Sequence, residues 1–206
     1  MRLAIIDYGA GNLRSVSKAV AHLGVEPNLT SSARDLLAAD AAILPGVGAA
    51  GDTMRSLTRL ELVEPIRQFV ASGRPFFGVC LGLQVLFTVS EEGGAQRCLD
   101  LIPGTVRRLP AGLKVPHMGW NQVRQVVRHP LFTGIPDGAY FYFVHSYFCQ
   151  PSDPGMTIGE TEYGLTFCSV LAADNVVATQ FHPEKSGHNG LQIYRNFLTL
   201  AGLGRG

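Results

Sequence analysis

The 206-residue chain has almost no excess charge of either sign, because 17 lysines and arginines stand against 16 aspartates and glutamates and the net charge is +1. A surface that binds nucleic acid is normally basic, often with aromatic side chains between the basic ones. No run of the sequence combines the two features. The charge therefore points neither to a nucleic acid nor to a membrane surface as partner.

Long apolar runs are missing at the N-terminus, where only a few apolar residues precede Asp7 in MRLAIIDYGAGN. Such a run is too short for the hydrophobic region of a signal peptide or for a membrane-spanning helix. We therefore expect a cytoplasmic protein.

Cysteine is scarce, and none of the four cysteines belongs to a CxxC pair. Structural zinc sites and disulfide frameworks need characteristic cysteine spacings, and cytosolic thiols are normally kept reduced. We expect four free thiols, no metal ion and no cofactor. The cysteines are Cys80, Cys98, Cys149 and Cys168.

Internal repeats and low-complexity segments are absent too, and the length suits one domain with its own core, so we expect residues 1–206 to form a single domain. Short apolar runs alternate with helical patterns through the first 90 residues, which is typical of an α/β fold with a parallel sheet wound by helices. The near-continuous apolar runs fit strands that are buried on both faces. The expected strands are Leu3–Asp7, Ala41–Leu44, stopped by Pro45, and Pro75–Val79, and the expected helices are Asn12–Leu23, Met54–Ser72 with a break near Pro65, and Leu83–Val89.

From about Thr105 the pattern changes to strands with few helices between them, which predicts an antiparallel extension of the sheet or a second small sheet. A final amphipathic helix is expected over Asn189–Leu200. The expected strands of this half are Thr105–Leu109, Asn121–Val127, Tyr140–Phe148, Leu165–Leu171 and Val176–Gln180.

One cysteine lies between two glycines, in Gly78-Val79-Cys80-Leu81-Gly82, where an apolar strand gives way to a helical run. This is the layout of a nucleophile elbow, in which a strained central residue exposes its side chain at the start of a helix. A thiolate is favoured near a helix N-terminus, and the N–H of Leu81 lies beside the nucleophile in such a turn. The pentapeptide alone fits a buried structural thiol about equally well.

A thiol nucleophile needs a base, and the base needs a partner that orients it. His182, in ATQFHPEKS, follows a predicted strand, and Pro183 favours an extended backbone there. Residues i and i+2 of an extended segment project to the same side, so Glu184 can hold one nitrogen of His182 and leave the other for a thiol. An HPE segment by itself fits an ordinary turn, and the pairing with the elbow favours catalysis.

Other chemistries fit the same residues less well. A zinc site lacks both an HExxH motif and a second cysteine at ligand spacing. In an α/β-hydrolase the acid precedes the histidine along the chain, whereas here Glu184 follows His182. The glycines of Tyr8–Asn12 do not form a dinucleotide-binding motif, because Arg14 occupies the third glycine position.

The loop Leu44–Gly48, sequence LPGVG, ends a predicted strand at the same sheet edge as the elbow. A glycine loop can turn backbone N–H groups toward an anion. It is therefore a candidate for a second oxyanion donor, and an ordinary turn is about equally compatible with the sequence.

The elbow GVCLGLQ, the preceding PGVG and the later FHPEKS, in this order, are similar to the class I, or triad, glutamine amidotransferases over nearly the whole chain. The segments IDYGAGNL, KVPHMGWN and YFVHSY narrow the resemblance to the glutaminase subunits of imidazole glycerol phosphate synthases. The resemblance implies that Cys80 attacks the side-chain amide of glutamine, that His182 protonates the departing ammonia and that Glu184 orients His182.

The resemblance also implies roles for residues around this triad. The oxyanion would be held by backbone N–H groups of Leu81 and of Val47 or Gly48. Contacts to the glutamine substrate are implied for Gly46, Gln84, Ser146 and Tyr147. The resemblance places five residues on the side that faces the partner, namely Asn12, Met118, Trp120, Asn121 and Lys185.

In this family the ammonia passes to a cyclase subunit with a (β/α)₈ barrel, which forms imidazole glycerol phosphate and aminoimidazole carboxamide ribotide in histidine biosynthesis. The resemblance thus implies a heterodimer with that subunit. Two alternatives are a glutaminase of another ammonia-using synthase, such as one for aminodeoxychorismate or pyridoxal phosphate, and a non-catalytic scaffold of the same fold. The HMGWN segment argues against another synthase, and the intact triad argues against a non-catalytic scaffold.

Overall fold

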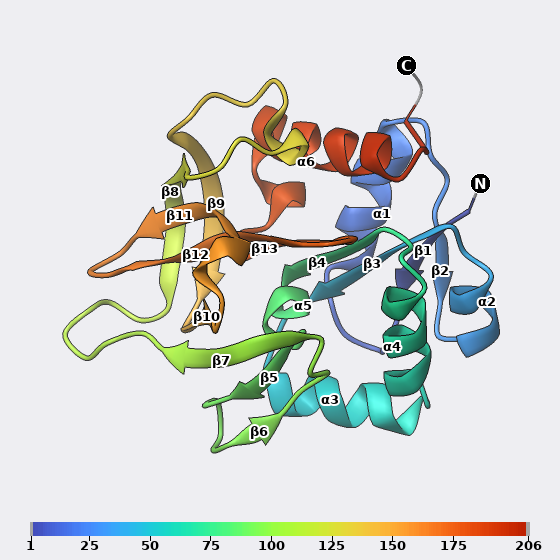
Figure 1. Ribbon diagram of the computed structural model, residues 1–206, viewed down its shortest axis with the longest axis horizontal. Coiled ribbons are helices and arrows are strands. Elements are labelled where there is room, and N and C mark those ends of the chain that lie inside the picture. Colours follow the sequence, from blue (N-terminus) through green and yellow to red (C-terminus); the bar gives the residue numbers. More distant parts are fainter. Residues whose placement is uncertain (1, 205–206) are drawn as a thin grey trace.

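The computed structural model describes residues 2–204, and its sheet has a parallel half of five strands in the order β2, β1, β3, β4 and β13 (Figure 1). Every residue of β1, β3, β4 and β13 is buried, because helices cover both faces of this half. This explains their continuous apolar sequences. The strands span Leu3–Ile6 (β1), Asn28–Thr30 (β2), Ala41–Gly46 (β3), Phe76–Cys80 (β4) and Val176–Thr179 (β13).

The sheet continues from β13 through strands that pair mainly antiparallel, as the sequence predicts. One branch runs through β12, β10, β7, β5 and β6, and a second leaves β12 through β11, β8 and β9. These strands are β5 (Phe87–Ser90), β6 (Gln96–Arg97), β7 (Ile102–Arg108), β8 (His117–Gln125), β9 (Ala139–His145), β10 (Tyr147–Pro151), β11 (Thr157–Glu162) and β12 (Thr166–Ala173).

The helices cover opposite faces of the parallel half and bury two separate apolar clusters (Figure 1). On one face lie α1 (Leu13–His22) and α6 (Gly187–Leu200). On the other lie α2 (Ala33–Leu37), α3 (Ala50–Arg59) and α4 (Val63–Ala71). The predicted fold class, a wound and mainly parallel sheet with an antiparallel extension, is confirmed.

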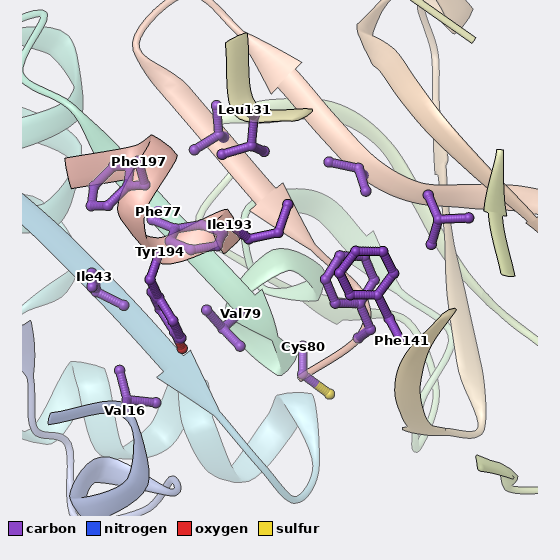
Figure 2. Close-up of a cluster of buried hydrophobic side chains, with 14 of the residues drawn as sticks. Val16, Ile43, Phe77, Val79, Cys80, Leu131, Phe141, Ile193, Tyr194 and Phe197 are labelled. Atoms are coloured by element: carbon purple, nitrogen blue, oxygen red, sulfur yellow. The ribbon is translucent and has the colours of Figure 1, made fainter. Parts of the chain in front are cut away.

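Strand β4 contributes to both clusters, since successive side chains of a strand point to opposite faces. Phe76 packs beside Phe69 in one cluster, and Phe77 packs against Tyr194 and Phe197 in the other. Figure 2 shows Cys80 at the end of this strand, with its sulfur directed away from Phe77 and Tyr194. The strand is therefore anchored on both faces just before the cysteine.

Several predicted element boundaries are wrong. Strand β3 was expected to stop before Pro45, but it runs through Pro45 to Gly46. Its pairing with β1 reaches only Ile43, so the missing N–H of the proline breaks no hydrogen bond on that side. The break in the predicted helix 54–72 falls at 60–62, where Glu61 has a φ of 55°, and Pro65 lies in the first turn of α4.

The third wrong boundary lies after the elbow, where helix α5 is limited to Leu81–Gln84. The following segment forms β5, which pairs parallel with β7. The predicted strand 140–148 is in fact two strands, β9 and β10, interrupted at Ser146. Ser146 is the point where the chain passes from one branch of the sheet to the other.

Among the described residues 2–204, no helix is both long and apolar enough to cross a membrane.

Candidate active site

Cys80 occupies a strained turn between β4 and α5, with a φ of 55° and a ψ of −107°. A positive φ is unfavourable for any residue with a Cβ, so the surrounding structure must hold this conformation. The flanking glycines allow the turn to pack: a Cβ on Gly82 would lie 1.9 Å from the Leu44 carbonyl oxygen, and one on Gly78 would lie 2.9 Å from that of Gly82. The predicted elbow is present, and tight packing is the reason that it needs glycine.

The glycine loop after β3 lies directly against the elbow. A Cβ on Gly46 would lie 2.7 Å from the Cβ of Leu81. Val47 and Gly48, which follow it, line a cavity of about 300 Å³ together with Cys80 and Leu81. The structure therefore brings the two predicted oxyanion segments to the same cavity as the cysteine, while Gly46 itself serves the close approach of β3 to α5.

His182 and Glu184 follow β13 and lie at the same edge of the sheet. The N–H of His182 donates to the Tyr142 carbonyl at 3.0 Å, which fixes the backbone in the extended form before the 3₁₀ turn Pro183–Lys185. Nδ1 of His182 lies 2.8 Å from Oε1 of Glu184, and both side chains are buried. The predicted contact between this histidine and this glutamate is present, and His182 also lines the cavity.

The environment of His182 favours its protonated form. Burial alone would lower the pKa, but the nearby Cys80 and Glu184 outweigh it and raise the pKa to about 10. Nε2 is buried and has no ordinary hydrogen-bond partner. The ring is thus held by Glu184 through one nitrogen, and the other nitrogen is free for a reacting group.

Two side chains hold Glu184 in turn. Nδ2 of Asn12 lies 3.4 Å from Oε1, and the hydroxyl of Tyr194 lies 3.4 Å from Oε2. Asn12, which the sequence places on the partner side, therefore has a contact inside the site. Burial, together with the nearby Glu184 carboxylate, raises the pKa of Tyr194 well above its ordinary value, which keeps its hydroxyl available as a donor.

A chain of buried amides reaches the sulfur of Cys80 from the opposite side. The amide nitrogen of Gln84 donates to the Tyr147 carbonyl at 2.9 Å and to Oε1 of Gln180 at 3.1 Å. Nε2 of Gln180 lies 3.8 Å from Sγ of Cys80. Both N–H groups of Gln84 are used within the protein, so only its carbonyl oxygen remains for a substrate.

Sequence reasoning missed Gln180 and Glu92. Gln180 is fully buried, and its only sequence signal is a polar residue at the end of an apolar strand. Glu92 lines the cavity with Ser146 and Tyr147, and its Oε2 accepts from the N–H of Ala50 at 2.7 Å, at the start of α3. Glu92 follows β5, a segment for which the sequence pattern predicted a helix. The sequence therefore gave no indication that Glu92 lies at the cavity.

Most residues that the sequence assigns to a partner lie on the surface formed by β8 and β9. Met118 and Trp120 are 61% and 56% exposed, and Tyr140 on the neighbouring strand is also exposed. Nζ of Lys185 lies 5.8 Å from the ring centre of Tyr142. Exposed large apolar side chains gathered on one surface are typical of a protein interface.

The other three cysteines differ from Cys80 in their surroundings. All four are buried and free. Burial raises the pKa of Cys98 to about 11 and that of Cys168 to about 12, and it raises that of Cys149 well above the ordinary value. These thiols are protonated at neutral pH and are poor nucleophiles. Within residues 2–204, no group of three or more histidines, cysteines, aspartates or glutamates is placed to hold a metal ion.

A strained cysteine, a carboxylate-bound histidine and a glycine loop around one cavity form the arrangement that acyl transfer through a thioester requires. The family model for class I glutamine amidotransferases matches residues 4–201, and the chain belongs to this family. A solved structure described as a glutamine amidotransferase has the same fold, with a TM-score of 0.78 at 20% identity over 98% of this chain and 100% of that one.

Closer relatives within the family carry a more particular name. The chain is 52% identical to the imidazole glycerol phosphate synthase subunit HisH of Dehalococcoides mccartyi, over 97% of both chains. It is also 52% identical to the subunit of that name from Moorella thermoacetica, over 96% of this chain and 94% of the relative.

Proposed function

We propose that the protein is the glutaminase subunit of an imidazole glycerol phosphate synthase and that residues 1–206 act as one glutamine amidotransferase domain. The observation that carries the proposal is the convergence of Cys80, His182 and the Val47–Gly48 loop on one cavity, with Glu184 behind the histidine. The HisH relatives, similar over nearly their whole length, support the particular synthase.

In the proposed reaction, the sulfur of Cys80 adds to the side-chain amide carbon of glutamine, and the thiol proton passes to Nε2 of His182. Negative charge then develops on the amide oxygen, where the N–H groups of Leu81 and of Val47 or Gly48 stabilise it. The C–N bond breaks as His182 delivers a proton from Nε2 to the nitrogen, which leaves as ammonia. Water next adds to the thioester, with His182 taking up its proton, and glutamate leaves as the thiol is restored.

The lining of the cavity suits the rest of a glutamine molecule. A carboxylate is the natural partner of the α-ammonium group of glutamine, and Glu92 supplies a carboxylate in the cavity lining. This side chain is held in place by the N–H of Ala50 at the start of α3, which donates to Oε2. Gln84, Ser146 and Tyr147 line the same cavity as Cys80 and would contact the remainder of the substrate. Among residues 2–204, no arginine or lysine lines this cavity, which does not favour a larger anionic substrate.

The proposal is tested by labelling with an electrophilic glutamine analogue, 6-diazo-5-oxo-norleucine, followed by peptide mapping. We expect modification at Cys80 alone, because it is the cysteine that lines the cavity and the other thiols are buried and protonated. The Cys80→Ala variant should lose glutamine-dependent synthesis by at least about 10³-fold. It should still support synthesis from external ammonium salt when the cyclase subunit is present. The matched variant Cys98→Ala should keep glutaminase activity, and labelling at Cys98, Cys149 or Cys168 would contradict the assignment.

The partner proposed for this subunit is the (β/α)₈-barrel cyclase of the same synthase. It would dock on the surface that carries Met118 and Trp120, with Lys185 beside Tyr142 and with Asn121 next to Trp120 along β8. Mixing the chain with that cyclase should produce a heterodimer and stimulate glutamine hydrolysis. Absence of both effects would move the assignment to another ammonia-using synthase.

A further inference from the structure

Two buried histidines outside the triad, His117 on β8 and His145 on β9, face each other across the strand pair. Nδ1 of His117 lies 2.8 Å from Nε2 of His145, and the two residues are opposite each other in the strand register. Both are about 95% buried or more. His117 is stacked between Phe143 and Tyr163, with ring centres 5.0 and 4.0 Å away.

The contacts at the two ends of the pair fix every proton in it. Nδ1 of His145 lies 2.8 Å from the Tyr147 carbonyl, which can only accept, so this nitrogen carries the hydrogen. Nε2 of a neutral His145 must then accept, and Nδ1 of His117 must donate to it. Nε2 of His117 accepts in turn from Nδ2 of Asn121, at 3.3 Å.

The assignment of Asn121 is independent of the histidines. Its Nδ2 also donates to the Glu162 carbonyl at 2.9 Å, and its Oδ1 accepts from the N–H of Gln122 at 2.8 Å. The nitrogen therefore faces His117. All donors run in one direction, from Asn121 through both rings to Tyr147.

We propose that His117 and His145 are positioning residues that hold the Tyr147 carbonyl in place, and through it Gln84 and the substrate wall of the cavity. The Tyr147 carbonyl accepts from His145 and from Gln84, whose amide also bonds Gln180 beside the Cys80 sulfur. The arrangement thus links half-buried Asn121 on β8 to the nucleophile through a series of hydrogen bonds. The inference rests on the proposed function only where it concerns glutamine.

The pKa values of the two histidines agree with two neutral rings. Burial lowers the pKa of His117 to about 4. Burial also lowers the pKa of His145 to about 3, and the nearby His117 and His182 contribute in the same direction, against the Tyr147 carbonyl. A proton added to either ring would place two N–H groups face to face, at His117–His145 or at Asn121–His117.

The proton arrangement is tested without any enzymatic assay, by long-range ¹H–¹⁵N spectra of the imidazole rings in the full-length chain. We expect both rings to be neutral with the hydrogen on Nδ1 from pH 5 to 8. An Nε2–H tautomer at either ring, or titration of either ring in this range, would overturn the proposal. This measurement tests the proton arrangement even if the chain hydrolyses no glutamine.

The positioning role is tested by two variants of His117 in the complex with the cyclase. His117→Phe keeps a stacked ring but has no donor for His145, whereas the amide of His117→Asn places a donor where Nδ1 was. We expect His117→Phe to raise the KM for glutamine about 10-fold, the effect of one lost buried hydrogen bond, with kcat within about threefold. His117→Asn should return KM to within about threefold of the parent. Equal KM values for the two folded variants would overturn the role, whereas failure of the proposed function would appear as an inactive parent.

Discussion

At the scale of single residues, three buried histidines respond to pH in opposite directions. His117 and His145 have pKa values of about 4 and 3, below the ordinary 6.5, because burial disfavours their charged forms. The unfolded chain therefore binds more protons than the native one between those values and pH 6.5, and stability falls as the pH falls through this range. His182 is also buried, but Cys80 and Glu184 raise its pKa to about 10, so its contribution is complete below pH 6.5 and is lost as the pH rises toward 10.

We therefore expect stability against urea to decrease on both sides of about pH 6.5. On the acid side each of the two histidines contributes a slope of about 1.4 kcal/mol per pH unit. The His117→Phe variant should lose about half of this slope between pH 6.5 and 5, where most carboxylates are still ionised. The His182→Gln variant should lose the decrease between pH 6.5 and about 8, below the range in which the buried cysteines titrate, and should keep the acid slope. An unchanged acid slope in His117→Phe would contradict the neutral state of that ring.

At the scale of elements, the approach of β3 and α5 to each other sets the shape of the elbow. A Cβ on Gly82 would overlap the Leu44 carbonyl oxygen at 1.9 Å, and a backbone atom cannot move away as a side chain can. We expect Gly82→Ala to destabilise the protein by about 3 kcal/mol or more, measured by urea unfolding. The control Gly51→Ala, in α3, meets only flexible side-chain atoms, at 3.3 Å or more, and should change stability by less than about 1 kcal/mol. Equal effects of the two substitutions would contradict this account.

The elements also show what could be predicted from the sequence. The elbow and the His182–Glu184 contact were predicted correctly, because each depends on residues that are close along the chain and on a strand with a clear apolar pattern. Gln180, Glu92 and Tyr194 were missed, because their roles arise from tertiary contacts with Cys80, Ala50 and Glu184. Residues 87–89 were expected to be helical, and they belong to β5 because pairing with β7 outweighs the local pattern.

At the scale of the whole molecule, the ends of the sheet at β9 and at β2 differ in what they expose. The branch that ends in β8 and β9 carries Met118, Trp120 and Tyr140, whereas the opposite edge strand, β2, exposes only Leu29 among the large apolar side chains. Both edges are visible in Figure 1. Asn121, whose side chain lies on the opposite face of β8 from Met118 and Trp120, begins the hydrogen-bond chain that leads through His117 to the cavity.

If this surface docks on the cyclase, an exposed tryptophan at its centre should contribute strongly to affinity, since buried aromatic anchors dominate most interfaces. We expect Trp120→Ala to weaken the heterodimer by about 2 kcal/mol or more, which is about 30-fold in Kd by isothermal titration calorimetry. Leu29→Ala removes an exposed apolar side chain of the opposite edge and should leave Kd unchanged. The two variants should unfold at the parent's urea concentration, because neither side chain belongs to the apolar clusters. A larger loss of affinity in Leu29→Ala than in Trp120→Ala would place the docking surface at the β2 edge, at the other end of the sheet from the β8–β9 branch.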